Sequence, residues 1–316
     1  MKDLFEVIKK LHPRFLRLQD ETYFTPEDID WKLSSRAIEE TLPTRINPIS
    51  EIIFVDSRRR SHISINVFGF TMIIAQIATG SAKWSEKDGC SLLFSTKNPP
   101  VIKTLLAMSQ ETADRFGLNP SDLVKVGSLV CEVVVGKTPK SALDSEMQHL
   151  ERQEVERRIQ QGELIIKDGG IDFTTPAFEP TVGPVGLVKN VHISYVDPET
   201  FIKYGSMKAG ERSHCRAVKM GRDFVRVMSY VKLIDREGMR GLVRIETSVE
   251  ERYLKEHKAS ILQLFSDIAS VLPFLTDDIP IPRLPEDILP IMFLEQALDN
   301  YLLSRDYVSN MTLREG

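Results

Sequence analysis

Three carboxylates of this chain directly follow short apolar runs, so each would lie at the end of a predicted strand. Asp56 follows Ile-Ile-Phe-Val, Asp168 follows Leu-Ile-Ile-Lys, and Glu246 follows Leu-Val-Arg-Ile. Runs this short and rich in β-branched residues are typical of buried strands. A carboxylate there is costly to bury unless it is hydrogen-bonded or holds a cation. The pattern predicts a shared cation site, and the alternative at each position is an ordinary polar strand end.

Divalent cations would give such a site its chemistry. Mg²⁺ and Mn²⁺ bind two or three carboxylate oxygens together with water, and a pair of these ions stabilises both the attacking and the leaving oxygen of phosphodiester cleavage. Lys189, which ends Gly-Leu-Val-Lys, is placed to contact a phosphate, unless it is a solvated lysine at a strand edge. Arg58, Arg59 and Arg60 follow Asp56 closely and would steer a nucleic-acid strand to it, unless they form a solvated surface run.

Other chemistries lack their motifs. Gly136-Lys-Thr138 resembles the end of a phosphate-binding loop, but Cys131 stands where that loop needs glycine. The chain contains no H-E-x-x-H, G-x-S-x-G or G-x-G-x-x-G, and its six histidines lack the spacing of zinc ligands. The three cysteines are odd in number and form no C-x-x-C pair, which indicates reduced thiols, a cytoplasmic protein and no thiolate zinc site.

Composition indicates an ordinary soluble protein. Hydrophobic residues make up 42% of the 316 residues and charged residues 27%. The net charge of −4 excludes a uniformly basic coat for nucleic acid, so phosphate contacts would use local patches. The first residues alternate charged and apolar types, so no signal peptide is expected. The most apolar window, Val67–Ala78, is too short to span a bilayer, so no membrane association is expected.

The elements that must position the acids are predicted from periodicity and from caps. Helices are expected over residues 2–11, 25–40, 101–116, 141–160, 249–272 and 287–303. Strands are expected over residues 52–55, 62–67, 71–78, 162–168, 185–189, 224–234 and 241–247. Residues 118–135 fit a helix start and a strand about equally. The order of these elements predicts an α/β protein with a mixed sheet flanked by helices.

These motifs occur in the order found in NurA-type nucleases, and residues 45–305 resemble that family. The resemblance rests on Ile-Phe-Val-Asp56, a helix carrying glutamates, Leu-Ile-Ile-Lys-Asp168-Gly, Val-Gly-Leu-Val-Lys189, Val-Arg-Ile-Glu246 and a late Ile-Pro-Ile-Pro-Arg-Leu segment. It implies an RNase H-like domain over 45–305, after an N-terminal helical arm over 1–44 and before C-terminal helices and a tail over 306–316.

The resemblance also implies a function. The family's activity is Mn²⁺- or Mg²⁺-dependent cleavage of DNA, mainly 5′ to 3′ exonucleolytic and in some members also endonucleolytic on single strands. It serves DNA end resection in recombinational repair, with a homodimer working beside a HerA-type hexameric translocase. Asp56, Glu151 and Asp168 would hold the metals, Glu246 or Asp287 would complete the set, and Lys189 would contact phosphate. Glu146 and Glu154 remain alternatives to Glu151, within about a helical turn of it.

Two departures from the family leave alternatives open. Ser57-Arg58 stands where the family has a glycine, and Asp287 stands where it has a histidine. These departures favour a catalytically weakened subunit that binds DNA or the translocase. Asp287 could be a helix cap or a metal ligand, and an enzyme acting on RNA is a third reading. For a competent site we expect Asp56 and Asp168 on adjacent strands, with carboxylates about 4–6 Å apart.

Overall fold

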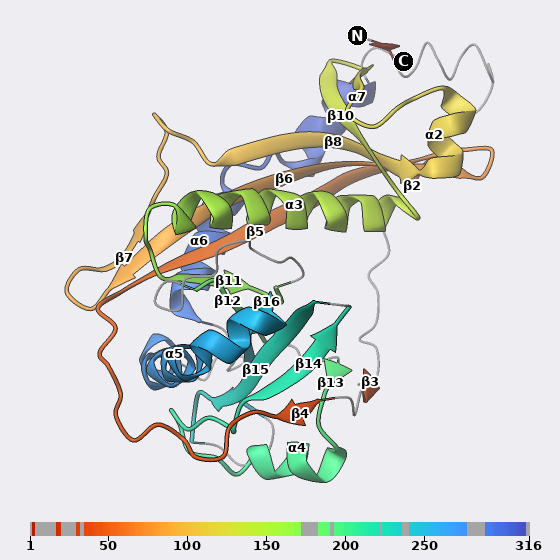
Figure 1. Cartoon of the computed structure of the whole chain (residues 1–316). Coiled ribbons are helices and arrows are strands. Elements are labelled where there is room, and N and C mark those ends of the chain that lie inside the picture. The colour runs from red at the N-terminus through yellow and green to blue at the C-terminus, as the bar shows by residue number, and fades with distance from the viewer. Residues whose placement is uncertain are drawn as a thin grey trace.

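The structure is a computed structural model that describes residues 2–3, 17–19, 30–31, 35–171, 183–189, 193–221, 223–235, 240–276 and 288–313. Within these ranges the chain builds one mixed 14-stranded sheet, and a separate two-stranded pair. Helices lie against both faces of the sheet (Figure 1). The predicted α/β architecture, a mixed sheet flanked by helices, is confirmed.

The strands are β1 (Lys2–Asp3), β2 (Arg17–Gln19), β3 (Asp30–Trp31), β4 (Arg36–Ala37), β5 (Glu51–Val67), β6 (Phe70–Ser85), β7 (Gly89–Leu92), β8 (Val101–Ser109), β9 (Leu123–Val126), β10 (Leu129–Gly136), β11 (Ile165–Asp168), β12 (Val185–Val188), β13 (Ile193–Ser194), β14 (Arg216–Met220), β15 (Phe224–Lys232) and β16 (Leu242–Glu250). The helices are α2 (Gln110–Phe116), α3 (Pro139–Ile159), α4 (Pro198–Tyr204), α5 (Glu251–Val271), the 3₁₀ turn η1 (Leu272–Leu275), α6 (Leu289–Asp299) and α7 (Arg305–Leu313).

The long hairpin β5–β6 is the centre of the sheet. β8 pairs antiparallel with β6, while β11 and then β12 continue on the other side of β5 in parallel. The central order is therefore β8-β6-β5-β11-β12. Beyond β8 the sheet continues through β10, β9 and β1, and beyond β12 it continues through β16, β15, β14 and β4.

Side-chain alternation along β5 decides which helix each residue meets. Ile53 and Val55 pack with Val155 of α3, whereas Ile52 and Phe54 join the core under α5. α6 lies over the same face as Ile52 and Phe54, where its Leu294 packs on β6. Neighbouring strand residues point to opposite faces, so a functional residue on β5 faces either α3 or α6. Figure 1 shows α3 lying along the long strands, with α6 behind them.

Of the four helices predicted after residue 100, three are confirmed and one is wrong. α3 and α5 match the helices expected over 141–160 and 249–272, and α6 matches the described part of the helix expected over 287–303. The segment expected as a helix over 101–116 is strand β8 up to Ser109, and only the short α2 follows. β8 lies between β6 and β10, so pairing within the sheet overrides its local helical pattern.

The ends of the chain also differ from expectation. Most of the predicted N-terminal helical arm lies outside the described residues. Where residues are described, at 2–3, 30–31 and 36–37, they are strands paired with β9, β13 and β14, so the helix prediction is wrong there. The predicted C-terminal tail begins within α7, whose Val308 is buried in the core beneath β5 and β10.

The segment from α5 through η1, residues 251–275, is long and apolar enough to cross a membrane by length and composition alone. Half of its most apolar window is buried inside the molecule, where Ile261, Phe265 and Ile268 belong to the largest core cluster. Packing against β15 and β16 accounts for the hydropathy of this helix.

Candidate metal centre

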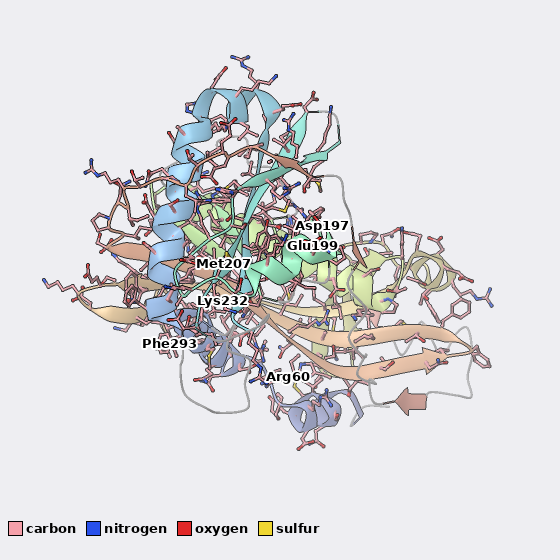
Figure 2. The ribbon with its side chains drawn as sticks, turned by 90° about the horizontal axis from the view of Figure 1, so that it is seen from below. Arg60, Asp197, Glu199, Met207, Lys232 and Phe293 are labelled. Atoms are coloured by element: carbon pink, nitrogen blue, oxygen red, sulfur yellow. The ribbon has the colours of Figure 1, made fainter. Side chains whose placement is uncertain are left out.

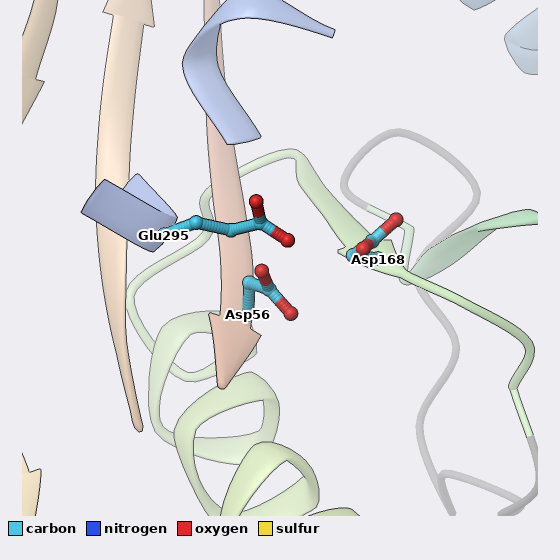
Figure 3. Close-up of side chains that lie close together, drawn as sticks. All are labelled: Asp56, Asp168 and Glu295. Carbon is cyan, nitrogen blue, oxygen red and sulfur yellow. The ribbon is translucent and has the colours of Figure 1, made fainter. Parts of the chain in front are cut away.

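Three carboxylates meet where β5, β11 and α6 come together. Asp56 lies on β5, Asp168 ends β11 and Glu295 lies on α6. One oxygen of each lies within 4.8 Å of the other two. Figure 3 shows Glu295 reaching across β5 toward Asp56, with Asp168 facing both from the neighbouring strand.

Parallel pairing brings the two aspartates together. Lys167 pairs with Val55 in the β11–β5 ladder, so Asp168 is the next residue beside Asp56. Both aspartates point to the face that also carries Phe54 and Ile166. The expectation that Asp56 and Asp168 lie on adjacent strands with carboxylates close enough to share a cation is confirmed, because one oxygen of each lies within 4.8 Å of the other.

The position of Asp56 within its strand was predicted wrongly. The acid does not end the strand, because β5 runs for 17 residues and its pairing with β6 passes through Asp56 and all three arginines. Asp56 therefore projects from the interior of the longest strand. The pairing of β5 with β6 continues before and after Asp56, so the backbone that carries this side chain is fixed.

Burial gives the two aspartates the character of cation ligands. Asp56 is only 5% exposed, and its Oδ2 has no hydrogen-bond partner among the described residues; Asp168 Oδ1 also has none. Burial, then the nearby charges of Asp168 and Glu151, raise the pKa of Asp56 well above its usual value. Buried oxygens without donors are rare and costly. Their convergence from three elements fits a hard divalent cation.

Lys189 lies beside the cluster, as the sequence predicted. Its Nζ is 3.0 Å from Asp168 Oδ2. Burial alone would lower the pKa of Lys189, but Asp168, Asp56 and Glu295 outweigh burial and raise it. The lysine is therefore a fixed positive charge at one side of the three carboxylates.

Glu151 approaches from the opposite face of the sheet. It lies on α3, where its Oε2 is 2.7 Å from Lys167 Nζ, and it is not one of the three converging acids. Burial raises the pKa of Glu151, while Lys167 and Ser57 oppose the rise. Its charge reaches Asp56 and adds to the raised pKa there.

The two alternatives to Glu151 are engaged elsewhere. Glu146 pairs with Lys103 at 2.8 Å. Glu154 pairs with Arg157 and Arg158 and accepts a hydrogen bond from Ser81. Neither is among the charges that raise the pKa of Asp56 most. Glu151 is thus the glutamate of α3 that acts on the cluster.

Glu246 does not reach the cluster, which corrects the sequence prediction. Its side chain is fully buried, and its Oε2 accepts a hydrogen bond from Arg244 Nε at 2.8 Å while its Oε1 lies 3.4 Å from Arg226 Nε. β16 lies beyond β12, and Glu246 points to the face opposite Ile245 and the α5 core. The other predicted ligand, Asp287, lies outside the described residues.

Sequence reasoning missed Glu295, the third acid. On α6 the residues Ile291, Leu294 and Leu298 are buried toward the sheet. Glu295 follows Leu294 and so lies at the border of this buried stripe. The available signal was an acid beside the apolar stripe of the last predicted helix. Only the packing of α6 over β5 shows that this acid lies near Asp56.

Each of the three arginines after Asp56 has partners of its own, although Arg58 and Arg60 also share Asp299. Arg58 faces α6 and lies 3.4 Å from both Glu295 Oε1 and Asp299 Oδ2. Arg59 points to the other face and lies 2.5 Å from Asp144 of α3. Arg60 donates to the carbonyls of Leu302 and Leu303, beyond the end of α6. The three arginines are therefore half-buried and paired, and Arg58 is the one that contacts an acid of the cluster.

Comparisons with known proteins add no family. No protein-family model matches the chain, and no curated protein matches it.

Proposed function

We propose that this protein is a metal-dependent nuclease that hydrolyses phosphodiester bonds in DNA. The observation that carries the proposal is the convergence of the buried Asp56 with the half-buried Asp168 and Glu295, in which two buried aspartate oxygens accept no hydrogen bond from any described residue. Lys189 and Arg58 flank this group with positive charge. A cation site bordered by two cationic side chains suits a substrate that carries phosphates.

The proposed core is of RNase H type. In support, β5, β6 and β8 form an antiparallel meander. After α2, β9 and β10 comes α3, and β11 and β12 then add in parallel beside β5. The two aspartates come from the first and the fourth strand of this unit. Such a unit places acids side by side at the middle of the sheet, as the sequence resemblance implies.

The proposed ligands are Asp56, Asp168 and Glu295, and the cation is Mn²⁺ or Mg²⁺. The bound ion would activate water and neutralise charge on the phosphate. Asp56 must give up its proton before it can act as a ligand, because its pKa is raised in the metal-free protein. Lys189 pairs with Asp168 and would donate a hydrogen bond to a phosphate oxygen of the substrate. Glu151 is committed to Lys167, and we leave it out of the ligand set.

The overall reaction is hydrolysis. The oxygen of water bonds to phosphorus, the ester P–O bond breaks, and the leaving oxygen takes up a proton. The partners implied by the resemblance, a second copy of the chain and a HerA-type translocase, belong to the proposal, as do a role in DNA end resection and a cytoplasmic location.

End-labelled oligonucleotides test the proposal. We expect DNA cleavage with Mn²⁺ or Mg²⁺ and none with EDTA, and we expect Asp56→Ala to abolish it. The control is Glu199→Gln on α4, an exposed acid that Figure 2 shows apart from Arg60 and from Phe293 of α6. Parallel RNA substrates distinguish the RNA alternative.

Two negative results have different meanings. A protein that binds Mn²⁺ and DNA but does not cleave would be the weakened binding subunit. A protein that binds no divalent cation in calorimetric titration would refute the site.

A further inference from the structure

We infer that Arg58 is a phosphate-contacting residue of this centre, paired with Glu295 in the metal-free protein and freed for substrate when Glu295 turns to a cation. The inference rests on the proposed metal-dependent chemistry. It assigns to one arginine a coupling between loading of the metal and binding of the phosphate.

Arg58 is loosely held. Its two contacts, Nη1 to Glu295 Oε1 and Nη2 to Asp299 Oδ2, are both 3.4 Å. Charge-assisted hydrogen bonds between guanidinium and carboxylate are ordinarily about 2.7–2.9 Å. Arg58 Nε is buried and has no hydrogen-bond partner among the described residues. The guanidinium therefore has a spare donor and two weak contacts that cost little to exchange.

Glu295 has two competing uses. Its carboxylate is within reach of Asp56 and Asp168 for a shared cation, and it is also the nearer acid to Arg58 in the cluster. A cation and a guanidinium both draw on the same negative charge. When Glu295 becomes a metal ligand, Arg58 keeps only Asp299, which is itself shared with Arg60 at 3.3 Å.

The position of Arg58 on β5 suits a phosphate bound at the cluster. It stands two residues after Asp56 and so points to the same face of the same strand. Lys189 stands on the other side, against Asp168. A phosphate lying over the three acids would meet one cation from each side, and the planar fork of arginine suits its oxygens.

The neighbouring arginines supply a contrast within the same strand. Arg59 is fixed to Asp144 on the opposite face, and Arg60 is fixed to main-chain carbonyls. Of the three, only Arg58 contacts an acid of the cluster. Arg59→Ala is therefore a control of the same residue type, one position away.

The experiment measures three quantities for wild type, Arg58→Ala, Arg58→Lys and Arg59→Ala. The first is Mn²⁺ affinity by titration calorimetry. Because Arg58 competes for Glu295, we expect Arg58→Ala to bind Mn²⁺ about two- to fivefold more tightly. The second is DNA affinity against salt with Ca²⁺ bound in place of Mn²⁺, the state in which Glu295 is a cation ligand and Arg58 is free, where the slope should fall by about one counterion. The third is Mn²⁺-dependent cleavage, which should fall about 100-fold.

Arg58→Lys should keep most of the salt slope but recover cleavage only in part, since it lacks the fork. Arg59→Ala should match wild type in all three measurements.

Two outcomes for Arg58→Ala would overturn the inference. If Arg58→Ala weakens Mn²⁺ binding in step with cleavage, Arg58 only positions Glu295. If the salt slope stays at the wild-type value, Arg58 makes no phosphate contact. Failure of wild type to cleave DNA would refute the proposed nuclease function instead, and the metal and salt measurements would still decide the role of Arg58.

Discussion

Glu39 and Asp56 are equally shielded from solvent, but the fold supplies hydrogen-bond donors to Glu39 and places acids around Asp56. Each is 5% exposed. Glu39 receives two hydrogen bonds from Arg212 and one from the N–H of Cys215, all at 2.7 Å. Asp56 has an oxygen to which no described residue donates, and acids are its neighbours. The carboxylate of Glu39 is therefore fully hydrogen-bonded within the protein, whereas that of Asp56 keeps an oxygen that a bound cation could use.

The pKa directions follow this difference. Burial alone would raise the pKa of Glu39, but Arg212 and the Cys215 N–H outweigh burial and lower it. Burial, Asp168 and Glu151 all raise the pKa of Asp56. Equal exposure is thus found in a buried ion pair in one region and in the proposed cation site in the other. The partners, and not the exposure, separate a structural acid from a functional one.

Removing the charge of Glu39 should give the largest effect on stability. Glu39→Gln leaves Arg212 buried without its counterion, which should cost about 3–5 kcal/mol of unfolding free energy. Urea unfolding measures the loss. The control is Glu251→Gln, which breaks the exposed pair with Arg36 and should barely move the midpoint. An equal effect of both changes would show that the buried pair contributes no more to stability than the exposed one.

Glu295→Gln should act on the metal instead. Loss of a ligand charge should weaken Mn²⁺ binding by about tenfold or more, with little change in stability, because the side chain is partly exposed. Asp299→Asn is the matched control, since Asp299 lies one helical turn on and also contacts Arg58 but is not among the three converging acids. Calorimetric affinities decide, and equal losses in both variants would remove Glu295 from the site.

Local patterns predicted the elements that carry these residues, but not how far they extend. β11, β12, α3 and α5 were recognised from short apolar runs and helical periodicity. The length of β5 was not, because Arg58, Arg59 and Arg60 look like a surface run. They stay in the sheet because acids of α3 and α6, distant in sequence, neutralise two of them and main-chain carbonyls hold the third.

The candidate site was predicted in part for the same reason. Asp56 and Asp168 belong together because parallel strands in register align their residues, which the motifs allow one to anticipate. Glu246 has the same local pattern but points to the other face toward two arginines, and Glu295 has no strand motif. Which face a side chain takes, and which helix covers it, are set by tertiary packing.

The affinity for Mn²⁺ should depend on pH, because the raised pKa of Asp56 sets this carboxylate apart from Glu39, whose pKa is lowered. Asp56 is protonated over a wider pH range than a free aspartate, so a cation must displace its proton. Mn²⁺ affinity should therefore rise with pH by up to about tenfold per unit until Asp56 is ionised, then level off. Titrations in buffers of different ionisation enthalpy should show proton release, and a flat affinity from pH 5 to 8 would contradict the raised pKa.

The smallest expected effect is a gain of stability on removing Asp56 from the metal-free protein. Because its pKa is raised in the folded state, the folded protein holds a proton that the unfolded chain has lost above its ordinary value of 3.8. Stability of the metal-free protein thus falls as pH rises from that value to the folded pKa.

Asp56→Asn has no proton to lose and keeps the neutral form at every pH. In EDTA at neutral pH this variant should melt about 1–4 °C above wild type, and the two should converge at acid pH. With Mn²⁺ the order should reverse, because only wild type gains from binding. The same acid would then destabilise the metal-free fold and stabilise the loaded one. Melting curves of both proteins with and without Mn²⁺ measure this, and a variant that is less stable than wild type in EDTA would place Asp56 with Glu39 as a structural acid.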